Sequence, residues 1–238
     1  YGIVPPFTIS HYGLPLSTKE RAQYERLSRS INETRSQILP MAPENRSSGA
    51  GFFQWLHAVA GRGGEAAGLA ARLTSDMSKR QALLYGSKSR GDAVEALLDQ
   101  EFSRNTDARA ILFHERVEEV MKLFVRLRAA GFSAIAEHSQ LPDNVREAGL
   151  ELFRHGVAQV IVSARSLIEG FNVPAVDVGI VVASSGSVRQ RIQSLGRVLR
   201  RHRGPDGEEK TSSMHILYVR DSVDDNIPGP HFSLPSPR

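Results

Sequence analysis

A glutamine and two arginines near the carboxyl end of the chain have the types and spacing to bind phosphate. Residues 193–200 read QSLGRVLR, which is the pattern Q-x-x-G-R-x-x-R. Residues three or four apart are neighbours on one helix face, and the arginine fork matches the oxygens of a phosphate group. An arginine so placed stabilises the charge that develops during phosphoryl transfer. Gln193, Arg197 and Arg200 therefore indicate a phosphate site, and the alternative is a solvated basic helix face.

Two further segments place polar residues directly after short apolar runs. Residues 163–174 read SARSLIEGFNVP and follow an apolar run ending at Val162, while residues 111–115 read ILFHE. A loop at the carboxyl end of a strand can direct backbone N–H groups at phosphate. A tight turn before an N-capped helix explains residues 163–174 equally well. For residues 111–115 taken alone, a histidine that only supports the local structure is the more common case.

The elements that must position these residues alternate in type along the second half of the chain. Continuous apolar runs are typical of strands that are covered by helices on both faces. Their alternation with amphipathic helices predicts parallel strands with crossover connections, in a RecA-like or Rossmann-like layer architecture. Of these we expect the first: the predicted fold class is α/β, a RecA-like parallel sheet with helices on both faces, preceded by a helical segment. The strands are expected at residues 110–113, 133–136, 159–162, 178–182 and 215–219, and the helices at 116–130, 143–154 and 188–201.

The first hundred residues predict helices without intervening strands. Ser17 and Glu20 form a capping-box pattern that should begin the first helix, and further helices are expected at residues 52–60, 66–84 and 91–102. The predicted organisation has four parts: an extended linker (1–16), a helical subdomain (17–105), the RecA-like domain (106–220) and an irregular tail (221–238).

The amino-acid composition limits which kinds of binding site and partner the chain can have. The chain has 238 residues, no cysteine and a formal net charge of +4, and its sequence pI of about 9.6 mildly favours an anionic partner. The absence of cysteine excludes disulfides and thiolate ligands, and the scattered histidines predict no metal held by this chain. No apolar run approaches the roughly 20 residues that span a bilayer, so we expect no membrane partner.

The three motifs, taken in order, resemble motifs IV, V and VI of superfamily 2 helicases and translocases. The similarity covers about residues 111–203, and His138 with Arg146 fits the segment that follows motif IV. Ala164 and Asn172 depart from the motif V pattern, where a threonine and an aspartate are usual. The opening, GIVPPF at 2–7 and LSTKERAQYERLS at 16–28, resembles the segment that joins the two motor domains in the XPB-like and restriction-translocase branch.

This resemblance implies a role for each candidate. Arg200 is the first choice and Arg197 the second for an arginine finger on the γ-phosphate of ATP, with Gln193 positioning nucleotide or water. The nucleotide would also be lined by Glu169, Gly170, Asn172 and Gly196. The resemblance implies contacts with the nucleic-acid backbone for Ser163, Arg165, His114 and His138.

Two expected motifs do not occur in this sequence. It contains neither a G-x-x-x-x-G-K-[ST] loop nor a DExH or DEAD box, the parts that cradle phosphate and organise Mg²⁺. We therefore expect a C-terminal motor domain of an ATP-dependent DNA helicase or double-strand DNA translocase, inactive alone and sharing ATP and Mg²⁺ with an N-terminal RecA-like domain. The expected location is cytoplasmic, nucleoid-associated in a bacterium, or nuclear. The alternative is a non-catalytic RecA-like module that binds nucleic acid or protein.

Overall fold

The computed structural model describes residues 7–44, 49–164, 176–185, 202–203, 209–210, 212–225 and 231–232. The chain forms two compact units, one made of residues 1–15 and 88–238 and the other of residues 16–87. We call them the sheet unit and the helical unit. Among the described residues, no helix is both long and apolar enough to cross a membrane.

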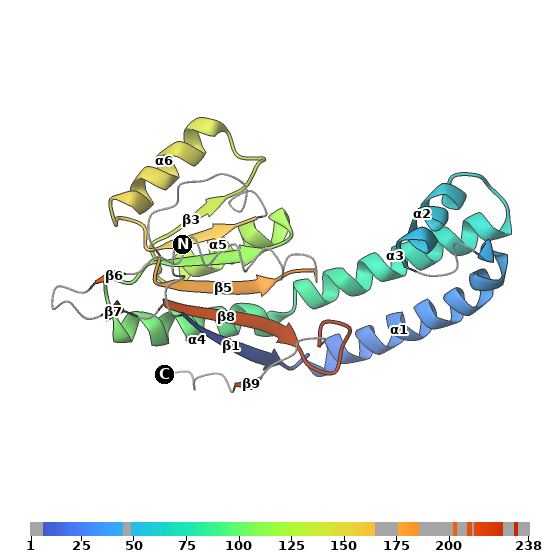
Figure 1. Cartoon of the computed structure of the whole chain (residues 1–238), viewed down its shortest axis with the longest axis horizontal. Helices are drawn as coiled ribbons and strands as arrows, with labels where there is room; N and C mark the ends of the chain where they lie inside the picture. The colour runs from blue at the N-terminus through green and yellow to red at the C-terminus, as the bar shows by residue number, and fades with distance from the viewer. Residues whose placement is uncertain are drawn as a thin grey trace, which may run out of the picture. The chain divides into compact units, whose positions relative to one another are not determined.

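The sheet unit is built on seven described strands in the order β3-β4-β2-β5-β8-β1-β9, and every neighbouring pair is parallel (Figure 1). This arrangement confirms the predicted parallel α/β sheet. The strands are β1 (Phe7–Leu14), β2 (Ala110–His114), β3 (Ala134–Glu137), β4 (Val160–Ser163), β5 (Val178–Ala183), β8 (Ser212–Val219) and β9 (His231–Phe232). A separate antiparallel pair joins β6 (His202–Arg203) and β7 (Glu209–Lys210).

Helices cover both faces of the sheet, which explains why the central strands β2, β4 and β5 are mostly apolar and buried along their whole length. On one face, α4 (Lys88–Arg104) and α5 (Val117–Ala129) pack against strand residues such as Leu112. On the other face, α6 (Asp143–Arg154) packs against residues of opposite parity such as Ile111. Successive strand residues point to opposite faces, so both parities must be apolar when both faces are buried.

The structure differs from the predicted division of the chain in two places. Phe7–Leu14, inside the predicted extended linker, forms a strand that pairs with all of β8, from Phe7↔Ser212 to Leu14↔Val219. Leu14 is fully buried in the sheet core. Helix α4, predicted as part of the helical subdomain, belongs to the sheet unit because its apolar side chains pack on the sheet.

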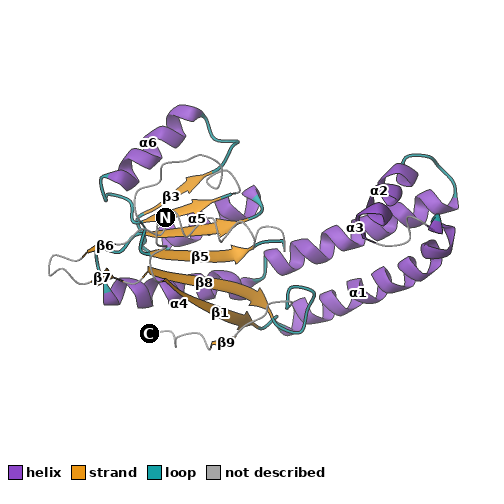
Figure 2. Ribbon diagram, in the orientation of Figure 1, coloured by secondary structure: helices purple, strands orange, loops and turns teal. Residues whose placement is uncertain are grey.

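The helical unit consists of α1 (Thr18–Ile38), the 3₁₀ turn η1 (Leu39–Met41), α2 (Gly49–Ala60) and α3 (Glu65–Tyr85) (Figure 2). The predicted capping box is present, since Ser17 Oγ accepts from Glu20 N and the Glu20 carboxylate accepts from Ser17 N at 2.8 Å. The unit has its own buried core, which consists of Ile31, Ile38, Phe52, Trp55, Leu56, Ala70 and Leu73.

Candidate nucleotide and nucleic-acid site

Four neighbouring strands end at one edge of the sheet and bring most of the described candidate residues together there. In register, Ser163 of β4 lies between Glu137 of β3 and Phe113 of β2, and His114 ends β2. Parallel α/β sheets bind their ligands outside the carboxyl ends of the strands. The edge therefore has the position expected of a functional site, and its side chains determine what it can bind.

His114 supports the start of the following helix. Its side chain is 3% exposed, and Nδ1 accepts a hydrogen bond from the backbone N–H of Arg116 at 3.0 Å. Arg116 is the N-cap residue of α5, so the imidazole satisfies one of the N–H groups that a helix start leaves unpaired. As placed, His114 serves the local structure, and its contact with a nucleic-acid strand stays a prediction.

His138 is also buried, at 4% exposure, just beyond the end of β3. Its Nδ1 accepts from Gln140 N at 3.3 Å, and its Nε2 lies 3.2 Å from Met121 Sδ of α5. Both ring nitrogens therefore face groups of the protein. The ring fixes the turn that leads from β3 to α6, and its predicted role in nucleic-acid binding is not tested by this placement.

Ser163 is fully buried, and its hydroxyl donates to the carbonyl of Ala164 at 2.7 Å. The hydroxyl therefore stabilises the turn out of β4, which continues into the motif V segment. A backbone bond from Ala164 N to Glu137 O, 2.9 Å long, extends the pairing of β4 with β3 by one residue. Ser163 as a nucleic-acid contact likewise stays a prediction.

The buried Glu137 and the partly exposed Arg146 form an ion pair at this edge. Arg146 Nε and Nη2 donate to Glu137 Oε1 at 2.8 and 2.6 Å, and Glu137 is 1% exposed. These hydrogen bonds raise the pKa of Arg146 above its ordinary value, against the opposing effect of burial. Arg146 therefore stays cationic, and Glu137 Oε2 has no hydrogen-bond partner among the described residues.

Glu115 was not singled out from the sequence, yet it fixes the loop that leads toward the arginine segment. Its carboxylate accepts from Ser185 N at 2.7 Å and from Ser185 Oγ at 3.2 Å, while its own N–H donates to Ala183 O. These hydrogen bonds join two loops that are seventy residues apart in the chain, at the carboxyl ends of β2 and β5. The signal in the sequence was an acidic residue directly after a strand, which is too common to be diagnostic.

The remaining candidates lie outside the described residues. They are Arg165, Glu169, Gly170, Asn172, Gln193, Gly196, Arg197 and Arg200. Within the described part of the chain, no group of three or more His, Asp or Glu residues could hold a metal ion. The two carboxylates of the edge, Glu115 and Glu137, already accept hydrogen bonds from Ser185 and Arg146. The described edge therefore fits a scaffold for phosphate-binding loops better than a Mg²⁺ site.

Comparison with known proteins shows what part of the chain is similar to. Residues 92–202 match the family described as the helicase conserved C-terminal domain. The chain is similar to the ATP-dependent rRNA helicase rrp3 of Sclerotinia sclerotiorum, with 32% identity over 91 residues covering 38% of this chain and 19% of that protein. The rrp3 protein of Aspergillus niger is 29% identical over 120 residues, covering 50% and 25%. The chain thus spans about a fifth to a quarter of these relatives' length.

Two solved structures share the fold. The helicase domain of Pyrococcus furiosus Hef is 15% identical, with a TM-score of 0.59 over 92% of this chain and 57% of that one. The C-terminal part of the Fun30 ATPase domain is 12% identical, with a TM-score of 0.62 over 93% and 88%. At these identities the likeness concerns the fold alone. Residues 92–202 are thus similar to a helicase C-terminal domain, and the sheet has the fold of the two solved structures.

Proposed function

We propose that this chain is the C-terminal motor domain of an ATP-dependent helicase or translocase that acts on double-stranded DNA. One observation carries the proposal: the helicase match runs from residue 92 to residue 202 and so includes the whole Q-x-x-G-R-x-x-R segment. The parallel sheet supports it, because ATP would bind at the carboxyl edge, in a cleft shared with an N-terminal RecA-like domain. The XPB-like branch and the cytoplasmic or nuclear location remain part of the proposal.

In this mechanism the arginines act on the transferring phosphoryl group. Arg200, with Arg197 as second choice, would place guanidinium donors against the γ-phosphate as charge spreads over its oxygens. Gln193 would position nucleotide or water, and Glu169, Gly170, Asn172 and Gly196 would line the nucleotide. Mg²⁺, held mainly by the N-terminal domain, neutralises phosphate charge when ATP is bound. Closure and reopening of the domains would move the protein along a strand.

RNA is the second candidate substrate, and one observation favours it. The curated relatives named above are rRNA helicases, and they share up to 32% identity with the chain. That similarity covers half of this chain or less. Phosphate contacts position a nucleic acid without reading its bases, so a motor core that contacts phosphates fits either substrate. Measuring ATP hydrolysis with duplex DNA and duplex RNA of the same sequence distinguishes the two.

The test is ATP hydrolysis by the intact protein, with and without duplex DNA, for wild type and Arg200→Ala. We expect DNA to stimulate the wild type and the substitution to lower the stimulated rate about 10³-fold or more, the size reported for arginine fingers. Arg128→Ala is the control, because Arg128 is exposed on α5 and forms no ion pair with a described residue. A stimulated rate within a few-fold of wild type would remove Arg200 from the catalytic step.

A second outcome concerns the function itself. If the intact protein hydrolyses no ATP under any condition, the non-catalytic RecA-like binding module becomes the favoured function. The open reading frame upstream of Tyr1 provides an independent check, because a Walker loop and an acidic box encoded there would support the motor. A strand-separation assay beside a translocation assay then distinguishes a helicase from a translocase that serves, for example, a restriction or defence nuclease.

A further inference from the structure

The excess positive charge of the chain lies entirely in the helical unit. Residues 16–87 contain ten Lys and Arg residues and six Asp and Glu residues, a formal net charge of +4. The whole chain has 30 and 26, also +4, so the other residues hold 20 of each sign. A charge excess confined to one unit creates a local positive potential that attracts anions.

In the sheet unit, five arginines are neutralised by carboxylates. Arg90 and Arg146 pair with buried carboxylates, and Arg126 pairs with both Asp92 and Glu95. The other two pairs are Arg104–Glu101 and Arg154–Glu151. The positive charge of these arginines is therefore largely used within the protein.

The arginines of the helical unit have different partners. Arg72 Nη2 donates to Ser30 Oγ at 3.1 Å, and Arg80 Nη1 donates to Ser28 Oγ at 3.3 Å. Among the described residues, neither arginine forms an ion pair. The nearby Asp76 accepts from Ser30 at 2.7 Å and pairs with Lys79 at 3.6 Å. Hydroxyl partners orient the guanidinium groups and leave them without a direct carboxylate contact among the described residues.

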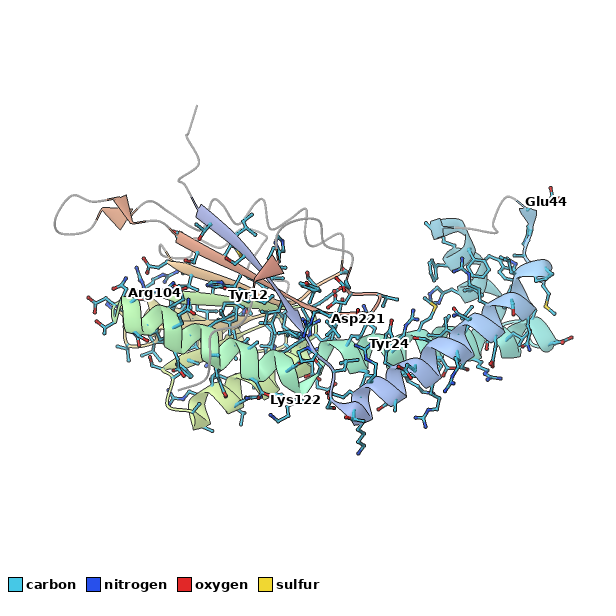
Figure 3. All side chains as sticks on the ribbon, turned by 90° about the horizontal axis from the view of Figure 1, so that it is seen from below. Tyr12, Tyr24, Glu44, Arg104, Lys122 and Asp221 are labelled. Carbon is cyan, nitrogen blue, oxygen red and sulfur yellow. The ribbon has the colours of Figure 1, made fainter. Side chains whose placement is uncertain are left out.

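Aromatic rings orient the arginines further. Arg80 lies over the ring of Tyr24, 6.0 Å from its centroid, and Arg21 lies 5.6 Å from the same centroid. Tyr24 belongs to α1 and is labelled in Figure 3. Arg35 lies over Phe52 in the same way, at 5.9 Å. A guanidinium stacked on a ring keeps its charge and its N–H donors, and it has lost part of its freedom before any ligand binds.

We propose that the helical unit binds the phosphate backbone of the nucleic-acid duplex on which the motor acts, with Arg72 and Arg80 contacting phosphates. This inference rests on the proposed function. The two arginines are eight residues apart on α3, about 12 Å along the helix axis, so they contact different phosphates. Contacts between arginines and phosphates position a nucleic acid without reading its bases, so this contact does not depend on sequence.

The experiment measures duplex binding by the intact protein without ATP, by fluorescence anisotropy over a range of salt concentrations. Arg72→Glu and Arg80→Glu should each weaken binding to labelled duplex DNA or duplex RNA. Each should also reduce the slope of log affinity against log salt by about 0.9, the contribution of one phosphate contact on B-DNA. Arg72→Lys and Arg80→Lys keep the charge and should retain most of the slope.

The control is Arg128→Glu, which makes the same charge change at an exposed arginine of α5 that has no ion pair among the described residues. An equal loss in Arg128→Glu, or unchanged binding to both duplexes in the two helical-unit variants, would overturn the inference. If the wild-type protein binds duplex and duplex stimulates its ATP hydrolysis, but the helical-unit variants bind duplex as the wild type does, the helical-unit contact is contradicted and the proposed function is not. If the wild-type protein neither binds duplex nor hydrolyses ATP faster in its presence, the proposed function is contradicted.

Discussion

Glu115 shows how one side chain can connect two loops of the site. It accepts two hydrogen bonds from Ser185, the last described residue before the arginine segment. Glu115→Ala should lower the free energy of unfolding by about 1.5–3 kcal/mol, the range for hydrogen bonds to a charged group. Amide hydrogen exchange at Ser185 should accelerate. Glu118→Ala, which removes an exposed carboxylate paired with Lys122, should change neither quantity appreciably, and equal effects in both variants would contradict this role.

Tyr12 gives the sheet a defined response to alkaline pH. Burial raises the pKa of its phenol, Glu101 raises it further, and Ser10 and Arg104 oppose this. A raised folded-state pKa means that stability is fully present below the unfolded value of about 10 and decreases as pH rises toward the folded value. Tyr12→Phe should flatten that decrease in chemical denaturation at several pH values. Part of the decrease should remain, because burial also raises the pKa of Tyr218.

The position of His114 and Ser163 in the fold could be predicted from the sequence better than the orientation of their side chains. The spacing of His114 and Ser163 relative to apolar runs correctly placed both at the carboxyl edge of the sheet. The burial of these two side chains was not predictable. It accompanies hydrogen bonds within the chain, from Arg116 N to His114 and from Ser163 to the carbonyl of Ala164. Short polar residues after a strand can point to solvent or bond to the chain, and local sequence does not distinguish these cases.

At the scale of elements, a buried ion pair joins the carboxyl ends of two neighbouring strands. Arg90 of α4 donates to the carbonyl of Val182 in β5 and to that of Leu217 in β8, the latter at 3.2 Å. It also pairs with Asp224 at 2.5 Å, and Asp224 in turn accepts from Val219 N at 2.9 Å. The pair therefore fixes the same strand, β5, that ends beside the Glu115–Ser185 bond.

Removing one partner of this pair should be strongly destabilising. Asp224→Asn leaves the Arg90 charge buried, at 2% exposure, without its counter-charge, which typically costs about 3–5 kcal/mol. Denaturant unfolding of the single and double variants measures the coupling. Arg90→Met with Asp224→Asn should be less destabilised than the sum of the two single variants. Strict additivity would mean that the pair contributes no coupling energy.

Element boundaries follow the sequence closely where local signals flank an element. Helix α6 has the predicted bounds Asp143–Arg154, since Pro142 precedes it and Gly156, with φ 73°, follows it. Strand β1 shows the opposite case. Its extended character was predictable from residues 3–16, but its partner β8 is about two hundred residues away in the chain. No local pattern encodes such a pairing, because the contacts form only when the sheet assembles.

At the scale of the whole molecule, the described residues form separate hydrophobic cores in the two units. The sheet unit has a core on each face of its sheet, one of which includes Leu112, and the helical unit has a third core that includes Leu56; both leucines are fully buried. The sequence indicated a change from helices alone to alternating strands and helices. It placed the boundary near residue 105 instead of residue 87, because helical periodicity alone does not show which core a helix such as α4 joins.

Separate cores predict separate responses to core substitutions. Leu56→Ala and Leu112→Ala should each cost about 2–5 kcal/mol, from lost burial and the cavity left behind. Hydrogen exchange followed by mass spectrometry should show faster exchange confined to residues 16–87 for Leu56→Ala and to the sheet unit for Leu112→Ala, because each unit can open as its own cooperative segment. If either substitution accelerates exchange equally in both units, the chain unfolds as one cooperative body.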